Sequence, residues 1–238
     1  MIKINNLNFA YPKRGKVQKQ SLFENFSLNI KKGKITSILG RSGCGKTTLI
    51  NLIAGYLKTE RGVIEKDGQV ITAPGRDRFV INQENDLFDW MTVYENVNFC
   101  SNGTGSADDC LRIVGLNEFK LKFPSELSGG MKKRVSFARA MIVNPDCLIM
   151  DEPFASIDYK KRNTLYAELL KFIKKTDKAI ILVTHDIDEA INLSDEIIVI
   201  GDTPVTVKAV FEIKNKDNLS SNELLKLKMK IKSVFGGD

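Results

Sequence analysis

The chain has 238 residues, of which 42% are hydrophobic, and a formal net charge of +7 at pH 7. This length can bury the core of one domain, and no apolar stretch approaches the ~20 residues that a membrane-spanning helix needs. The lysines are scattered and accompany no nucleic-acid-binding motif, so we expect a solvated basic surface and no nucleic-acid partner. Four cysteines without a Cys-x-x-Cys pair argue against a metal cluster or a disulfide framework.

The N-terminal part, residues 2–30, predicts β-structure. Its first five residues alternate between apolar and polar side chains and lack the apolar core of a signal peptide. Asp67 and Gly68 predict a hairpin turn later in the same β-rich part. We therefore expect a cytoplasmic protein whose contact with a membrane comes through a partner.

Residues 40–47, with the sequence Gly-Arg-Ser-Gly-Cys-Gly-Lys-Thr, match the phosphate-binding motif G-x-x-x-x-G-K-[ST] without a gap. Residues 34–39 predict a buried strand before this loop, and residues 46–57 predict a helix after it. Glycines let successive backbone N–H groups surround phosphate oxygens at a helix start, whose partial positive charge favours an anion. We expect Lys46 to reach the β- and γ-phosphates and the Thr47 hydroxyl to bind Mg²⁺.

Cys44 lies inside this loop, beside Lys46 and the expected helix start, where a thiolate is favoured. We therefore expect that alkylation of Cys44 blocks nucleotide binding and that bound nucleotide protects the thiol. The alternative is that Cys44 serves only as a small spacer in the loop.

Residues 127–131, with the sequence Leu-Ser-Gly-Gly-Met, come between the phosphate loop and an acidic strand end. A serine hydroxyl and free backbone amides at the start of a helix form an anion site. A symmetric partner could press this site onto a bound nucleotide, so the pattern predicts an enzyme that closes as a dimer.

The acidic strand end follows an apolar run over residues 147–150 and consists of Asp151 and Glu152. The pattern is typical of a central strand that delivers carboxylates to the ligand-binding edge of a parallel sheet. We expect Asp151 to hold Mg²⁺ and Glu152 to orient or deprotonate an attacking water. Taken alone, such a pair can also be a helix cap or a surface charge.

His185 is the only histidine, and it follows a third apolar run over residues 179–184 that predicts a central strand. At the same sheet edge as Lys46 and Glu152, it is a candidate for donating a hydrogen bond to the γ-phosphate. A packed or solvent-facing role is the alternative for a lone histidine.

Taken together, these motifs resemble the nucleotide-binding subunit of an ATP-binding-cassette (ABC) transporter, over about residues 2–210. Residues 40–48 match the Walker A loop, and residues 147–151 match Walker B. Other matches, in chain order, are Tyr11 (adenine stacking), Gln83 (Q-loop), residues 127–131 (signature), Glu152 (catalytic glutamate), residues 156–158 (D-loop) and His185 (switch histidine). Simple packing on a β-sheet is the alternative for Tyr11.

The resemblance implies that two copies sandwich two ATP molecules, with Ser128 and Gly130 of one copy touching the γ-phosphate held by the other. It implies three sets of site residues. The nucleotide-binding set is Tyr11, Gly40, Ser42, Gly43, Cys44, Gly45, Lys46, Thr47, Thr48, Ser128, Gly129 and Gly130. The catalytic set is Glu152, His185 and Gln83, and the Mg²⁺-binding set is Thr47, Gln83 and Asp151.

The implied fold is α/β, with a P-loop NTPase core in which helices flank a mostly parallel sheet, an antiparallel β-subdomain and a small helical subdomain. One domain is expected over residues 1–238, with the β-rich part and core at 1–84 and 143–213, the helical subdomain at about 85–142, and a tail at 214–238. The implied partners are a membrane permease, a second copy of the chain and, indirectly, a solute-binding protein. The protein is expected to be peripheral at the inner face of the cell membrane.

Met131, the basic residues after it, and residues 87–93 are most similar to importers of the nitrate, sulfonate and taurine group. We therefore expect an ATPase that energises import of a small solute through a separate permease. The alternatives are an ATPase of a lipoprotein-release or cell-division ABC system, or a non-transport ABC ATPase acting on nucleic acid or the ribosome.

The secondary structure of two further stretches has to be predicted separately. Residues 98–115 are short for a helical subdomain of this family, and their Ser-Asn-Gly-Thr-Gly-Ser core predicts a turn. In the tail, residues 225–232 alternate as a strand would, whereas Ser220 and Glu223 form a capping-box pattern. We favour a helix there because Leu224, Leu227, Ile231 and Val234 share one helical face.

Overall fold

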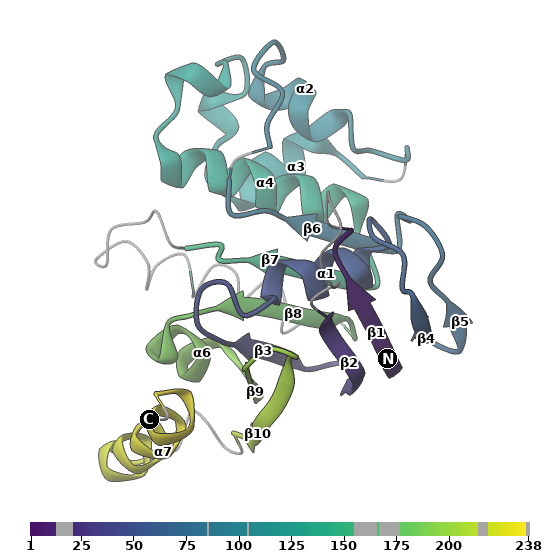
Figure 1. Ribbon diagram of the computed structural model, residues 1–238. Coiled ribbons are helices and arrows are strands. Elements are labelled where there is room, and N and C mark those ends of the chain that lie inside the picture. Colours follow the sequence, from purple (N-terminus) through teal and green to yellow (C-terminus); the bar gives the residue numbers. More distant parts are fainter. Residues whose placement is uncertain are drawn as a thin grey trace. The chain divides into compact units, whose positions relative to one another are not determined.

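The computed structural model describes residues 1–12, 21–84, 86–103, 105–154, 166, 177–213 and 219–236 (Figure 1). The chain divides into two units, which we describe separately. Met1–Gly75 and Asp177–Asp238 form the first unit, and Arg76–Thr176 forms the second unit. The D-loop expected at residues 156–158 lies outside the described residues.

The first unit contains an antiparallel sheet with the strand order β2-β1-β4-β5. Its strands are β1 (Ile2–Ala10), β2 (Ser21–Ile30), β4 (Arg61–Lys66) and β5 (Gln69–Val70). Asp67 and Gly68 join β4 to β5 with φ angles of 51° and 83°. Two left-handed residues are what a two-residue hairpin turn requires, so the predicted turn is confirmed.

The second sheet of the first unit is built around β3 (Ile35–Leu39), which pairs in parallel with β8 (Ala179–Thr184) and β9 (Glu196–Gly201). The strand β10 (Thr206–Glu212) pairs with β9 in the antiparallel direction. Every residue of β3 and β8 is buried, as expected of parallel strands covered on both faces. The strands predicted at residues 34–39 and 179–184 are therefore confirmed.

Helix α1 (Lys46–Ala54) follows the phosphate loop and is shorter than the predicted helix over residues 46–57. It ends because Gly55 is left-handed, with φ 84°, and its N–H donates to the carbonyls of Asn51 and Leu52. A Cβ at Gly55 would lie 2.4 Å from the carbonyl oxygen of Ala73, so only glycine fits. Leu57 therefore lies beyond the helix, and the predicted helix end at residue 57 was wrong.

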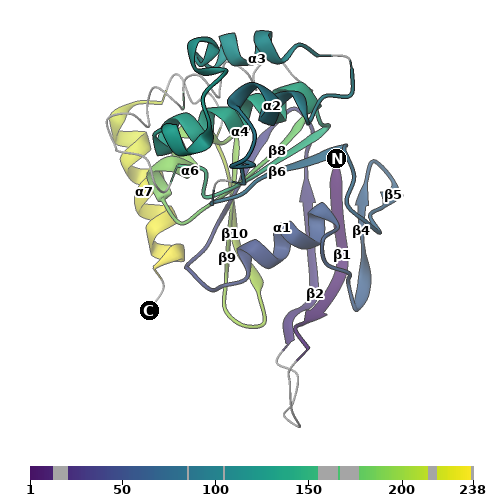
Figure 2. The same ribbon diagram turned by 90° about the horizontal axis from the view of Figure 1, so that it is seen from above.

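The tail forms a helix, α7 (Ser221–Phe235), and its capping box between Ser220 and Glu223 is present. Both views show α7 beside α6 (Ile187–Leu193) (Figures 1 and 2). Ile231 is fully buried against a cluster that includes Leu39 and Val199. The favoured helix is confirmed because its 3.6-residue period, unlike a strand's, gathers the apolar side chains on one face.

The second unit contains two parallel strands, β6 (Arg78–Ile81) and β7 (Cys147–Asp151). Among the described residues of this unit, the helices are α2 (Val93–Asn98), α3 (Ala107–Ile113) and α4 (Gly129–Val143), with short 3₁₀ turns at Asn117–Phe119 and Pro124–Glu126. In the Ser-Asn-Gly-Thr-Gly-Ser stretch, the described residues 101–103, 105 and 106 are not helical, which agrees with the predicted turn. Among the described residues, no helix combines the length and apolarity needed to span a lipid bilayer.

Candidate nucleotide-binding site

The phosphate loop connects β3 to α1, and its winding depends on glycine. Gly43 and Gly45 have φ angles of 80° and 99°, in the left-handed region that side chains rarely adopt. Gly45 is the N-cap of α1 and provides no capping side chain. The backbone amides at the start of this helix can therefore serve an anion.

Lys46 is buried, although it carries the positive charge that the motif requires. Its Nζ donates to the carbonyl oxygens of Gly40 at 2.8 Å and Arg41 at 3.1 Å. Both acceptors belong to the phosphate loop, so the ammonium group lies within this loop and gives it a positive charge. Phosphate oxygens are stronger acceptors for an ammonium group than neutral carbonyls, so the position is suited to an anion.

Tyr11 follows β1 and is half-exposed, with 49% of its surface accessible. Its hydroxyl lies 2.9 Å from the hydroxyl of Thr48 in α1, and its ring meets the ring of Phe9 edge-on, with centroids 5.0 Å apart. These contacts hold the ring next to the helix that follows the phosphate loop. An exposed aromatic ring at this place is suited to stack on a base.

Cys44 is half-buried, and burial raises the pKa of its thiol. The charge of Lys46 and backbone hydrogen bonds lower the pKa, but their effect is smaller. The prediction that the loop favours a thiolate was therefore wrong: removal of the sulfur from water outweighs the neighbouring cation.

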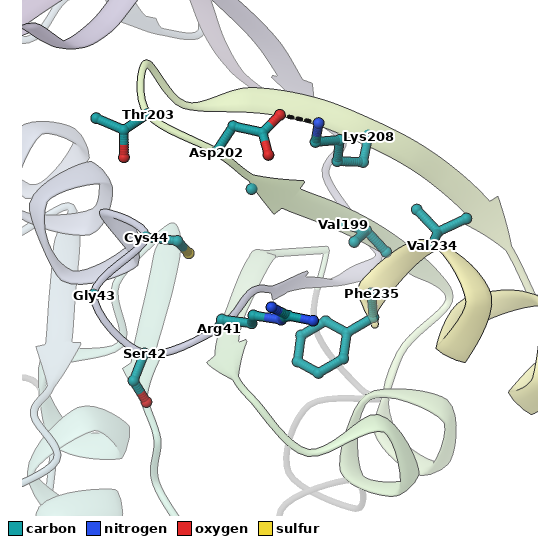
Figure 3. Close-up of a pocket in the computed structure, with 11 residues that line it drawn as sticks. Arg41, Ser42, Gly43, Cys44, Val199, Asp202, Thr203, Lys208, Val234 and Phe235 are labelled. Carbon is teal, nitrogen blue, oxygen red and sulfur yellow. Dashed lines mark hydrogen bonds and ion pairs between the residues drawn. The ribbon is translucent and has the colours of Figure 1, made fainter. Parts of the chain in front are cut away.

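A cavity of about 460 Å³ adjoins the loop (Figure 3). Loop residues 41–44 line one side, and the β9–β10 turn and the end of α7 line the other. The guanidinium of Arg41 donates to the carbonyl oxygen of Gly236 at 2.7 Å, and Lys208 pairs with Asp202. The cavity includes the side chain of Cys44, so a reagent can approach the thiol from this side.

His185 directly follows β8 and is exposed. The parallel register aligns Thr184 of β8 with Leu39 of β3, and the N–H of Gly40 donates to the carbonyl oxygen of Thr184 at 3.4 Å. His185 and the first residue of the phosphate loop, Gly40, therefore both lie at the carboxyl ends of adjacent parallel strands. Gly40 and His185 therefore share one sheet edge, while the expectation that Lys46 and Glu152 lie at this edge stays a prediction.

Two candidate site residues of the second unit lie at the end of β7. Asp151 is the last residue of the strand and is buried, and Glu152 follows it and is half-buried. The register pairs Met150 with Ile81 of β6, so the segment that contains Gln83 leaves the same edge. Glu152 has a φ angle of 42°, in the left-handed region that a non-glycine residue rarely adopts. Such strained backbone is concentrated at functional sites.

The signature residues form the start of α4. Ser128 is the N-cap, and its Oγ accepts a hydrogen bond from the N–H of Met131 at 3.3 Å. A Cβ at Gly129 or Gly130 would meet no atom within 4 Å, so the space on the Cβ side of these two residues is open. Ser128 and Gly129 are exposed, which leaves this helix start accessible to an anion.

The structure thus places the expected site residues in two groups. The first unit holds Tyr11, residues 40–48 and His185, and the second unit holds Gln83, residues 128–130, Asp151 and Glu152. Sequence reasoning missed Lys133, which is buried in α4 and donates to the carbonyl oxygen of Gln83 at 3.0 Å. A signal for its burial was its spacing of four residues from Phe137 and seven from Ala140, which are buried in α4.

A family model described as "ABC transporter" matches residues 23–155. This chain belongs to the ABC transporter family. The taurine import ATP-binding protein TauB of Jannaschia sp. (strain CCS1) is 38% identical to it over 231 residues, which cover 94% of this chain and 85% of that protein. The bicarbonate transport ATP-binding protein CmpC of Synechococcus elongatus is 37% identical and covers 85% of this chain and 32% of its own length.

Solved structures agree with this assignment. The dimeric structure of MJ0796, a bacterial ABC transporter cassette, is 30% identical, has a TM-score of 0.79, and covers 90% of this chain and 100% of that chain. A dimeric post-hydrolysis state of the same cassette, bound to ADP and Pi, is 29% identical with a TM-score of 0.78. The expected P-loop fold, the ABC family and the similarity to the taurine importer group are therefore confirmed.

Proposed function

We propose that this ABC ATPase hydrolyses ATP as a dimer and thereby energises the import of a small solute through a separate membrane permease. The observation that carries the proposal is the accessible anion site at the start of α4, formed by Ser128 and the amides of Gly129 and Gly130. When two copies associate, this site binds the γ-phosphate of the ATP that the other copy holds. The solved relatives, which are dimeric cassettes, support this arrangement.

ATP is held by the phosphate loop, with Lys46 donating to the β- and γ-phosphates and Tyr11 stacking on adenine. Mg²⁺ is the metal that suits the remaining donors, which are the Thr47 hydroxyl, the Gln83 amide oxygen and the Asp151 carboxylate. Oxygen ligands of this kind fit Mg²⁺ better than softer metals. Asp151 is a buried carboxylate at a strand end, and Thr47 is exposed at the start of α1, so both are suited to this role.

The hydrolytic roles belong to Glu152 and His185. Glu152 orients or deprotonates the attacking water, because a carboxylate can accept a proton from it. His185 donates a hydrogen bond to the γ-phosphate and stabilises the charge that develops on its oxygens. Gln83 would act on the same nucleotide by binding Mg²⁺ and the attacking water.

The permease contact is proposed for an aromatic surface of the second unit, formed by Phe88, Trp90 and Phe99. Trp90 is 72% exposed and Phe99 is 61% exposed, and the rings of both lie 5.2 Å from the ring of Phe88. Exposed aromatic clusters of this kind mark interaction sites. A permease at this surface would hold the protein at the cytoplasmic face of the membrane.

Hydrogen bonds to one buried side chain fix the conformation of the loop that contains Phe88 and Trp90. The fully buried Asn96 accepts a hydrogen bond from the N–H of Phe88 and donates to the carbonyl oxygens of Phe88, Met91 and Thr92, at 2.8–3.1 Å. One buried amide thus organises the backbone beneath the exposed rings. A preformed surface loses less entropy when it binds a partner.

Relatives named for taurine import and bicarbonate transport support an importer over a lipoprotein-release, cell-division or nucleic-acid role. To test the proposal, a tagged Glu152→Gln form is loaded with ATP, and the proteins that co-purify from detergent-solubilised membranes are identified by mass spectrometry. Recovery of a polytopic permease supports the proposal. Recovery of ribosomes or DNA, or of nothing from the membrane, contradicts it.

The matched control is the double variant Glu152→Gln/Trp90→Ala. Because Trp90 is exposed, we expect this variant to fold and bind ATP as the parent does, yet to lose the permease. Equal recovery of the permease with and without Trp90 would contradict the proposed contact surface.

A further inference from the structure

The signature helix α4 contains a buried cation that no assigned role explains. Lys133 is only 5% exposed, and its Nζ donates to the carbonyl oxygens of Asn82 at 2.6 Å and Gln83 at 3.0 Å. These two carbonyls follow β6, where the chain turns toward the Q-loop glutamine. Lys133 thus joins the backbone at Gln83 directly to the helix whose N-cap is Ser128.

A second buried cation of the same helix holds the next part of this segment. Arg139 donates to the carbonyl oxygen of Asp86 at 2.7 Å, and its guanidinium lies over the ring of Phe88, 5.3 Å from the centroid. The segment from Asn82 to Phe88 is therefore attached to α4 at both ends. The guanidinium is planar and presents its donors in a fixed geometry, so these two contacts restrain the segment.

The position of Lys133 is electrostatically costly. Burial lowers the pKa of Lys133, and the charges of Asp86 and Asp151 raise it by a smaller amount. An apolar side chain of similar length would avoid the loss of hydration. A buried ammonium that donates to two carbonyls is thus better explained by the geometry that it sets than by core packing.

We propose that Lys133 is a positioning residue, which holds the Gln83 backbone at a set distance from the signature at Ser128. Ser128 and Lys133 are five residues apart on one rigid element, so a movement of the signature carries Gln83 with it. Binding of the signature to the nucleotide of a second copy would then place the Gln83 side chain for hydrolysis. This inference rests on the proposed function, since it assumes that Gln83 acts on the bound nucleotide.

The test uses Lys133→Met in the full-length protein, with Lys132→Met as the matched control on the same helix. Methionine keeps the length and the helix propensity of lysine but removes the donors. We expect kcat for ATP hydrolysis to fall ~10- to 10²-fold in Lys133→Met, because misplacement by about 1 Å has effects of that size. The Kd for ATP and the rate of Lys132→Met should stay near those of the native protein.

Lys133→Arg retains donors for both carbonyls and should recover most of the lost rate, which a purely steric role would not explain. If Lys133→Met does not fold, Lys133→Leu supplies the same comparison, because leucine also lacks a donor. Failure of Lys133→Arg to recover any rate, or a native kcat in Lys133→Met, would overturn the proposal.

A double-mutant cycle with Gln83→Ala identifies the residue through which Lys133 acts. Without the Gln83 side chain, the Lys133→Met substitution should cause no further loss of kcat. Additive losses would mean that Lys133 acts elsewhere, and would overturn the inference while leaving the proposed function intact. Absence of ATPase activity in the native protein would instead count against the proposed function itself.

Discussion

The hydroxyl groups of Tyr11 and Thr48 lie 2.9 Å apart, so the residue that follows β1 is hydrogen-bonded to the first turn of α1. Thr48 lies two residues after Lys46, the lysine of the phosphate loop. The antiparallel sheet and the helix that follows the phosphate loop are therefore connected through this hydrogen bond. This contact gives Tyr11 two separable properties, a ring that can stack and a hydroxyl that fixes it.

Substitutions of Tyr11 separate these two properties. Tyr11→Phe keeps the ring, so we expect the Kd for ATP to rise by no more than about 5-fold, the value of one hydrogen bond of ~1 kcal/mol. Tyr11→Leu removes the aromatic face and should raise the Kd by ~10-fold, since stacking contributes about 1–3 kcal/mol per base. Fluorescence titration with ATP measures both. Equal Kd values for Tyr11→Leu and the native protein would return Tyr11 to a packing role.

Glu152→Gln should retain ATP binding but lose ATP turnover by ~10²-fold or more, because an amide cannot accept the proton of the attacking water. Glutamine has the same shape and the same backbone strain at φ 42°, so the melting temperature should not change. An assay of phosphate release measures the rate of turnover, and equilibrium binding measures the Kd for ATP. Hydrolysis near the native rate would rule out Glu152 as the general base.

His185→Ala is expected to lower kcat by ~10²-fold, the usual effect of one oriented hydrogen bond to the developing charge. Because His185 is exposed, the free energy of unfolding should change by no more than about 0.5 kcal/mol. Steady-state ATPase assays and thermal denaturation measure the two effects. An unchanged kcat would show that the histidine has no role in hydrolysis.

Alkylation of Cys44 should depend on pH and on ATP. Because burial raises the pKa of this thiol, little thiolate is present near pH 7, and the labelling rate should rise about 10-fold per pH unit until the pKa is reached. Saturating ATP-Mg²⁺ should protect the thiol, and alkylation should block ATP binding. Peptide mass spectrometry with iodoacetamide follows the reaction, and Cys44→Ser corrects for the buried Cys100, Cys110 and Cys147. Labelling that is equally fast with and without ATP would leave Cys44 as a spacer.

Much of the local structure could be predicted because it depends on short-range patterns. The apolar runs before Gly40, Asp151 and His185 predicted buried strands, and all three are present. The capping box at Ser220 also predicted the start of α7. The end of α1 was missed because Gly55 is required by the nearby carbonyl of Ala73, which lies outside the helix.

Sequence patterns were enough to predict the family, the strand–loop–helix units and the chemical groups of the site, because glycine turns, helix caps and apolar periodicity act between neighbouring residues. The tertiary structure alone decided that Cys44 is shielded enough to raise the pKa of its thiol and that Tyr11 bonds to Thr48. It also decided that Lys133 of α4 donates to the carbonyl oxygen of Gln83, 50 residues away in the chain. Burial and hydrogen bonding of this kind depend on which distant segments pack together, and no local pattern specifies that.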